Sequence, residues 1–152
     1  MSNWPDLAGR LEDSTHILPV RVYYEDTDFT GIVYHGSYVR FFERGRSDML
    51  RMIGIHHAEL QEGGADGRSL AFAVRGMTLD FARPATIDDV LTVRTQLLSA
   101  RGAKIELHQE IWREVEKLVS ANVTVAVITS EGRPTRLTER MRESLGKITP
   151  AS

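Results

Sequence analysis

A change of hydrophobic period at Gly31 is the feature of this sequence that most constrains its fold. Before Gly31, residues 17–24 alternate in a way that is typical of a half-buried strand. After it, apolar residues recur at helical spacing and fall on one stripe: Tyr34, Tyr38, Phe41, Phe42, Gly45, Met49, Met52 and Ile53. A helix with one long apolar stripe needs a sheet to cover it. The sequence therefore predicts a single long helix over 34–53 packed on strands.

Four strand patterns follow this helix, at 70–81, 90–98, 103–112 and 118–128. In the first, the apolar phase slips at Arg75-Gly76, which predicts a β-bulge. The run from Ser99 to Gly102 predicts a hairpin turn between the second and third, and residues 138–145 predict a short closing helix. One strand, one long helix and four more strands predict an α+β fold, with the helix on one face of a five-stranded antiparallel sheet.

The length of 152 residues predicts one domain that spans 1–152. Residues 1–15 are polar and show little periodicity, so we expect a mobile lead-in with a short helical turn near 7–11. Gly45 lies within the apolar stripe, and its cost of about 1 kcal/mol in helix propensity points to a close approach of another backbone. Gly54 predicts the end of the helix. The glycine-rich residues 56–69 predict a loop that begins with a short turn of helix.

Composition and charge exclude several classes of function. The chain has no cysteine, which excludes a cysteine nucleophile and fits a reducing compartment. Its formal net charge of −2 gives no indication of a nucleic-acid partner. No apolar run approaches the roughly 18 residues of a membrane span, and the N-terminus lacks the features of a signal peptide. We therefore expect a cytoplasmic protein.

Two carboxylates, Asp26 and Asp28, precede the predicted helix by a few residues. Asp at such a position often serves only as a cap, because its side chain accepts hydrogen bonds from amides that lack a partner. The alternative is that Asp28 takes part in catalysis. Amides at a helix start carry partial positive charge and would polarise a substrate carbonyl, with the Asp28 carboxylate close enough to attack it or to direct water at it. The turn alone leaves both interpretations open.

A wider set of residues around this turn resembles the 4-hydroxybenzoyl-CoA thioesterase family. The set is Tyr24, Asp26, Asp28, Gly31, Val33, Tyr34, His35, Tyr38, Phe42, Glu43 and Arg46. Within the family, the run through Tyr34-His35 to Phe42-Glu43 is most similar to the bacterial tol-pal-associated acyl-CoA thioesterases. Matching residues are frequent over 20–55. They are fewer, but keep the same spacing, to about residue 135.

The resemblance implies a hotdog fold and hydrolysis of a CoA thioester without a metal ion or other cofactor. Asp28 matches the family's catalytic aspartate, either as a nucleophile that forms an acyl-enzyme anhydride or as a general base for water. Amides near Tyr34 and His35 would hold the thioester oxygen, and Gly31 and Val33 would contribute to the substrate site. The His35 side chain has two possible roles. It is either packed or solvated without a function, or it hydrogen-bonds the substrate or Asp28.

The other polar candidates have an ordinary structural interpretation beside the functional one. Asp26 is assigned to the turn, because Asp readily hydrogen-bonds its own backbone there. Glu43 and Arg46 match the family pattern, yet an ion pair within the chain explains them. The run His56-His57-Ala58-Glu59 predicts no metal site, because adjacent histidines diverge on a helix and the sequence offers no second ligand cluster with zinc spacing.

Four basic residues in or beside predicted turns could contact the phosphates of CoA, as arginine side chains often do, although surface solvation explains each one singly. They are Arg101, Lys104, Arg133 and Arg136. In hotdog proteins the active site commonly lies between subunits, and pairing hides the exposed edge of a five-stranded sheet. We therefore expect a homodimer or homotetramer. The resemblance also suggests an acyl carrier protein as a partner.

Two other functions are compatible with the predicted fold. A non-catalytic acyl-CoA-binding or regulatory protein would keep the pocket without turnover, but binding alone would not need the carboxylate of Asp28. A hotdog dehydratase uses His–Asp or His–Glu chemistry in a different sequence setting, which this chain lacks. The sequence does not indicate the length of the acyl chain or whether it is aliphatic or aromatic.

Overall fold

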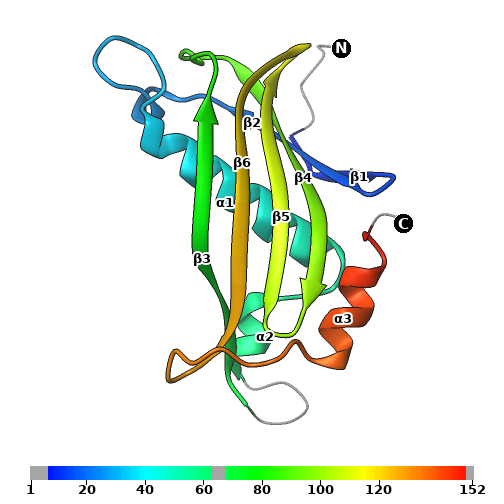
Figure 1. Ribbon diagram of the computed structural model, residues 1–152. Helices are drawn as coiled ribbons and strands as arrows, with labels where there is room; N and C mark the ends of the chain where they lie inside the picture. The colour runs from blue at the N-terminus through cyan, green and yellow to red at the C-terminus, as the bar shows by residue number, and fades with distance from the viewer. Residues whose placement is uncertain (1–6, 63–67, 150–152) are drawn as a thin grey trace.

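The computed structural model describes residues 7–62 and 68–149. In this part of the chain, a six-stranded antiparallel sheet packs against one long helix, α1 (His35–Met52), which crosses one face of the sheet (Figure 1). The sheet order is β1-β2-β4-β5-β6-β3, for strands β1 (Arg10–Glu12), β2 (Thr15–Arg21), β3 (Leu70–Phe81), β4 (Val90–Arg101), β5 (Lys104–Arg113) and β6 (Glu116–Thr129). Two short helices, α2 (His57–Glu62) and α3 (Glu139–Gly146), follow α1 and β6. The predicted α+β hotdog arrangement is confirmed.

The sixth strand, β1, corrects two expectations for the start of the chain. Residues 10–12 pair with β2 in a short hairpin, so they form neither a mobile lead-in nor a helical turn. The turn between the two strands contains Asp13, whose φ of 56° lies in the left-handed region that Asp tolerates. A strand of three residues is too short to show a period of two, which is why the sequence pattern missed it. Residues 1–6 lie outside the described part.

The other strands differ from expectation mainly at their ends. The bulge in β3 is confirmed, since its register against β6 shifts between Val74 and Gly76. The strand β4 runs on to Arg101, which pairs with Lys104, so the hairpin turn is two residues and lies later than predicted. The strand β2 stops at Arg21, and Tyr24–Asp26 instead form one turn of 3₁₀ helix. No helix within the described residues is long and apolar enough to cross a membrane.

The helix α1 ends as the sequence predicts. Gly54 has a φ of 92°, and its amide donates to the carbonyl of Arg51 at 3.0 Å. The amide of Ile55 donates to the carbonyl of Leu50 at 2.8 Å. These two bonds form a Schellman motif, which satisfies carbonyls that the last turn leaves without a partner.

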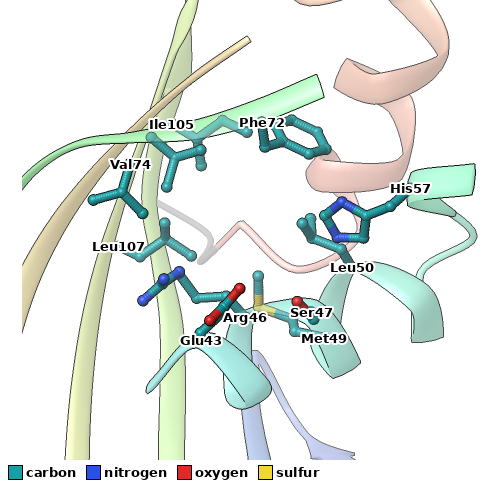
Figure 2. Close-up of a pocket in the computed structure, with 11 residues that line it drawn as sticks. Glu43, Arg46, Ser47, Met49, Leu50, His57, Phe72, Val74, Ile105 and Leu107 are labelled. Atoms are coloured by element: carbon teal, nitrogen blue, oxygen red, sulfur yellow. The ribbon is translucent and has the colours of Figure 1, made fainter. Parts of the chain in front are cut away.

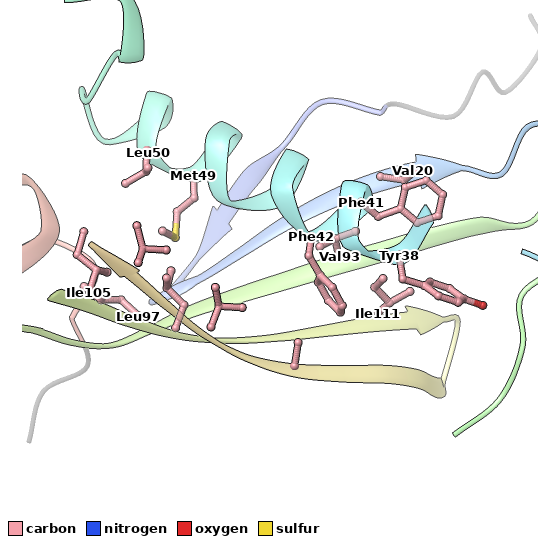
Figure 3. Close-up of a cluster of buried hydrophobic side chains, with 14 of the residues drawn as sticks. Val20, Tyr38, Phe41, Phe42, Met49, Leu50, Val93, Leu97, Ile105 and Ile111 are labelled. Carbon is pink, nitrogen blue, oxygen red and sulfur yellow. The ribbon is translucent and has the colours of Figure 1, made fainter. Parts of the chain in front are cut away.

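The core lies between α1 and the concave face of the sheet (Figure 3). Phe41, Phe42 and Met49 on the helix are fully buried against inward residues of β4 and β5, among them Val93, Leu97 and Ile111. Gly45 does have a packing reason, because a Cβ there would lie 2.8 Å from Cγ1 of Val93, but the atoms close to it belong to side chains and not to the backbone that was predicted. Two members of the predicted stripe, Tyr34 and Met52, are exposed, whereas its last member, Ile53, is buried.

A small polar network lies beneath the middle of α1. The buried Arg46 donates from Nη1 to Oε1 of Gln109 at 2.9 Å. Gln109, fully buried on β5, donates from Nε2 to the carbonyl of Phe42 at 3.0 Å and to Oγ1 of Thr95 at 2.9 Å. Each of these buried groups therefore has a partner, and together they join the helix to the central strands.

Candidate active site

A tight loop between the 3₁₀ turn and α1 presents Asp28 to solvent. Thr27 and Val33 form an isolated antiparallel bridge that closes the loop. Within it, the amide of Asp28 donates to the carbonyl of Ile32 at 2.8 Å, and the amide of Gly31 donates to the carbonyl of Asp28 at 3.1 Å. Gly31 has a φ of 85°, a conformation that favours glycine. We call residues 27–33 the catalytic loop.

The carboxylate of Asp28 is exposed and held by a single neighbour. Its Oδ1 accepts hydrogen bonds from the amide of Thr30 at 2.8 Å and from the hydroxyl of Thr30. These bonds, the hydroxyl's first, lower the pKa of Asp28 below its ordinary value. Among the described residues, Oδ2 has no hydrogen-bond partner. Asp28 therefore closes its own turn and does not cap α1, and one oxygen of an ionised carboxylate stays available.

The start of α1 offers two amides without an acceptor in the described part of the chain, those of His35 and Gly36. The N-cap residue is Tyr34, whose side chain makes no capping bond. Its amide donates to the carbonyl of Asp26 at 3.0 Å, so among the amides near Tyr34 and His35 this one already has an acceptor. The amide of Ser37 is also occupied, by the carbonyl of Tyr34 at 2.8 Å. The donors available to a ligand are thus at positions 35 and 36.

Gly36 is a candidate site residue that the sequence interpretation missed. A Cβ at this position would lie 2.7 Å from Cε2 of Tyr34, so the aromatic ring occupies the space that a side chain would need. The rings of Tyr34 and His35 lie with their centroids 4.3 Å apart. The signal in the sequence was a glycine in the first turn of a helix, where a bare amide can meet a ligand closely.

Asp26 has the turn role that was expected of it. Its buried side chain accepts from the amide of Tyr23 at 2.8 Å, and its carbonyl accepts from the hydroxyl of Ser37 at 2.9 Å as well as from the amide of Tyr34. Arg40 lies 3.9 Å from the carboxylate. These contacts fix the 3₁₀ turn to the first turn of α1.

A hollow of about 260 Å³ lies beside this helix start. It is lined by Val33, His35, Tyr38, Phe81 and residues 82–84. The buried Tyr38 accepts a hydrogen bond from the amide of Ala85 at 3.0 Å, and burial raises the pKa of its hydroxyl. The centroids of the Tyr38 and Phe81 rings are 5.8 Å apart. The hollow thus has an aromatic wall and opens next to the free amides.

A second, mainly apolar pocket of about 90 Å³, which we call the apolar pocket, lies under the other half of α1 (Figure 2). Its walls come from α1, α2, β3, β5 and β6, and its polar members are Glu43, Arg46, Ser47 and His57. Burial lowers the pKa of Arg46, and the charge of Glu43 opposes that change. Arg46 hydrogen-bonds Gln109, as described above, so Glu43 acts on it through charge. The ring of His57 meets Phe72 edge-on, with centroids 5.8 Å apart.

The four basic residues gather at the end of the sheet remote from Asp28. Arg101 and Lys104 flank the β4–β5 turn, and the amide of Leu137 donates to the carbonyl of Gly102 at 2.7 Å, which brings the loop with Arg133 and Arg136 to this turn. The catalytic loop lies at the opposite end of β4, where Val90 pairs with Arg21. At about 3.3 Å per residue, the length of β4 separates the two groups by roughly 35 Å. One chain does not bring them together.

Comparison with known proteins agrees with this geometry. Residues 30–120, which begin just after Asp28 and include α1, match the family described as "Thioesterase superfamily". The chain belongs to this family. Over 116 residues, this thioesterase is 40% identical to the acyl-CoA thioesterase YbgC of Haemophilus influenzae, which covers 76% of this chain and 82% of the relative.

Two further relatives extend the comparison. The acyl-CoA thioester hydrolase YbgC of Escherichia coli O6:H1 is 48% identical over 93 residues, which cover 61% of the thioesterase described here and 66% of that relative. The crystal structure of a probable thioesterase from Bartonella henselae superposes with a TM-score of 0.78 at 44% identity, covering 82% of this chain and 99% of the other. The resemblance stated from the sequence is confirmed, as is the hotdog fold.

Within the described residues, no group of three His, Asp or Glu side chains is placed to hold a metal ion. The two histidines at the start of α2 differ in their surroundings, since His57 lines the apolar pocket while His56 does not. The chemistry available at the helix start is therefore that of a carboxylate, two backbone amides and an adjacent hollow.

Proposed function

We propose that this thioesterase hydrolyses an acyl-CoA thioester with Asp28 as the catalytic carboxylate. Acyl-CoA thioester hydrolysis is the activity named for its relatives at 40% and 48% identity. The observation that carries the assignment to Asp28 is that its exposed carboxylate, with a lowered pKa, lies in the loop that leads directly into the start of α1 and its two free amides. Negative charge at Asp28 and positive partial charge at positions 35 and 36 are what addition to a carbonyl requires.

In this mechanism, the thioester oxygen accepts hydrogen bonds from the amides of His35 and Gly36. These donors sit at the positive end of the α1 dipole and stabilise the negative charge that develops on the oxygen when the carbonyl becomes tetrahedral. Asp28 either attacks the carbonyl carbon and forms an acyl-enzyme anhydride or takes a proton from the attacking water. Collapse of the intermediate breaks the carbon–sulfur bond and releases CoA. Both roles need an ionised carboxylate, which the lowered pKa of Asp28 provides at neutral pH.

One isotope experiment can identify a nucleophilic Asp28. In a single turnover in H₂¹⁸O, a nucleophilic Asp28 takes up ¹⁸O when water opens the anhydride at the enzyme's carboxyl carbon, or leaves the label in the product when water attacks the acyl carbon. Repeated turnovers therefore label Asp28 only if the anhydride forms and opens at the enzyme side. Mass spectrometry of the peptide that contains Asp28 detects this label, with Asp26 in the same peptide as an internal control. A labelled Asp28 shows the nucleophilic role, whereas an unlabelled Asp28 is compatible with both roles.

We also propose that the active enzyme is a homodimer, or a homotetramer built from such dimers, joined through β3. In the described chain β3 is an edge strand of 12 residues, paired only with β6. A long unpaired edge with exposed apolar side chains, here Val74 and Phe81, favours pairing with another strand. Antiparallel pairing of two β3 edges would place the Leu70 end of one strand beside the Phe81 end of the other.

This pairing would unite parts that one chain keeps apart. Phe81 lines the hollow at the start of α1, whereas Phe72 and Val74 line the apolar pocket. In an antiparallel dimer, the apolar pocket of one subunit would lie toward the helix start of the other, and the basic residues around Arg101 would approach the same site. The pocket would then receive the acyl group, and the basic residues would bind the CoA phosphates.

Release of free thiol from a panel of acyl-CoA esters tests the function. Turnover of at least one ester supports hydrolysis, whereas binding without release would support the non-catalytic alternative. Acyl-loaded acyl carrier protein in the same assay examines that suggested partner. Sedimentation tests the assembly: a stable, active monomer at micromolar concentration would refute the shared site.

A further inference from the structure

The segment 82–89, which connects β3 to β4, lies directly against the catalytic loop. The amide of Val33 donates to the carbonyl of Ala85 at 2.9 Å, and the amide of Ile87 donates to the carbonyl of Gly31 at 3.1 Å. Ile32 and Thr86 form an isolated antiparallel bridge. The same segment supports the first turn of α1, since the amide of Ala85 donates to the hydroxyl of Tyr38. The position of the catalytic loop relative to α1 therefore depends on this segment.

The segment is in turn held by Arg113, at the end of β5. Its Nη1 donates to Oδ2 of Asp89 at 2.8 Å and makes a longer contact of 3.5 Å with the carbonyl of Pro84. Its Nη2 donates to Oε1 of Glu116 at 2.9 Å, and the other oxygen of Glu116 accepts from Arg83. One guanidinium thus reaches both ends of the segment, directly at residues 84 and 89 and through Glu116 at residue 83.

Asp89 connects Arg113 to Thr86, which lies next to the catalytic loop. Besides Arg113, its Oδ2 accepts from the amide of Thr86 at 2.9 Å and from the hydroxyl of Thr86 at 3.2 Å. Burial alone would raise the pKa of Asp89, but the bonds from Thr86 and Arg113 lower it overall. Arg113 is about 30% exposed and bonds two carboxylates, those of Asp89 and Glu116, so these contacts are stronger than an ordinary surface ion pair.

We propose that Arg113 is a positioning residue for hydrolysis: it fixes the segment 82–89, and through it the distance between Asp28 and the free amides of α1. This inference rests on the proposed role of Asp28. Without the guanidinium, Asp89 and Glu116 lose their shared partner and the carbonyl of Pro84 loses its contact. The segment then keeps its backbone bonds to Leu118 and Val22 at its two ends and to the catalytic loop. A displacement of about 1 Å at a reacting group can cost 10²-fold in rate, so loss of this hold reduces turnover although Arg113 touches no substrate.

The test compares Arg113→Gln, which removes the charge, with Arg113→Lys, which keeps the charge but cannot fork between two carboxylates. Thiol release is measured well below the melting temperature of the least stable variant. We expect Arg113→Gln to lower kcat by about 10-fold or more with KM within about twofold, because the loss falls on the transition state. Arg113→Lys should recover part of that loss. Arg142→Gln on α3, an exposed arginine outside the site, is the matched control and should stay within about twofold of the wild type.

A double-mutant cycle with Asp89→Asn makes the inference specific. If Arg113 acts through Asp89, the double variant is no slower than the slower single variant, because both changes break one contact. Losses that multiply, or a folded Arg113→Gln enzyme with kcat within twofold of the wild type, overturn the proposal. If Arg113→Gln does not fold, the test rests on Arg113→Lys. A kcat of Arg113→Lys equal to that of the wild type would contradict a positioning role for Arg113. A fully active Asp28→Asn enzyme would instead overturn the proposed function, whatever Arg113 does.

Discussion

Replacing Asp28 by Asn removes the charge of the carboxylate and very little else. The Asn side-chain oxygen can accept the same two hydrogen bonds from Thr30, so the turn keeps its geometry. Asp28 is exposed and makes no other side-chain contact among the described residues. A substitution of this kind on the surface changes the melting temperature by no more than about 2 °C in a chain of this size.

The loss of charge should appear almost entirely in turnover. A positioned general base or nucleophile contributes roughly 10²- to 10⁴-fold, and an amide at position 28 can serve as neither. The amides of His35 and Gly36 stay in place in this variant, so acyl-CoA binding and residual polarisation of the carbonyl persist. We therefore expect kcat for thiol release to fall by at least about 10²-fold while KM changes little.

Asp26→Asn is the matched control. Its carboxylate is buried in the 3₁₀ turn and bonds the amide of Tyr23, so this change should lower the melting temperature more and kcat less than Asp28→Asn does. If Asp28 only closed its turn, both Asn variants would turn over normally and only Asp28→Ala would lose stability. A fully active Asp28→Asn enzyme would therefore refute the acyl-transfer interpretation.

Three further predictions follow from the same geometry. Thr30→Val removes the hydroxyl that lowers the pKa of Asp28, so that pKa should rise and the acid limb of the kcat/KM profile should move to higher pH; an unmoved limb would exclude Asp28 as the titrating group. A variant with alanine at Arg101, Lys104, Arg133 and Arg136 should have a higher KM for CoA esters and a nearly unchanged kcat. An unchanged KM would show that the CoA phosphates bind elsewhere. His16 is fully buried, with its Nε2 2.7 Å from Oδ2 of Asp48, and burial lowers its pKa. The contribution of His16 to folding stability is therefore complete above the unfolded pKa of about 6.5 and is lost as the pH falls toward the lowered pKa of the folded state. The melting temperature should drop over that range in the wild type and less in His16→Gln, and equal slopes would contradict this.

The sequence predicted the elements whose apolar pattern is long. The stripe predicted from Tyr34 to Ile53 located α1, the slip at Arg75-Gly76 located the bulge of β3, and Gly54 located the Schellman motif. These features depend on the local spacing of apolar residues and on one or two positions that few residue types can occupy. Tertiary pairing decided the rest, as with β1, which is too short to carry a pattern.

At the site, residue types were easier to predict than hydrogen-bond assignments. The sequence indicates that Asp28 precedes a helix, but whether the amide of Tyr34 is free depends on where the carbonyl of Asp26 points. The same limit applies to Arg113, which is remote from Asp28 in sequence and reaches the loop only through the segment 82–89. The separation of the basic residues from Asp28 likewise follows from the direction of β4, which no motif records.

The hydrogen bonds of Gln109 have a consequence for the axial register of α1. Apolar side chains such as Phe41 and Met49 make non-directional contacts, which tolerate a small slide or rotation of a helix over a sheet. A bond from Gln109 to the carbonyl of Phe42 does not tolerate it, and a helix is rigid at 1.5 Å per residue, so this bond also fixes where the amides of His35 and Gly36 stand. Gln109→Leu leaves Arg46 without its acceptor, whereas Gln109→Leu with Arg46→Met replaces the buried polar pair by apolar groups, which is often neutral or stabilising. We expect the double variant to melt near or above the wild type yet turn over more slowly. Unchanged kcat in that variant would show that packing alone sets the register.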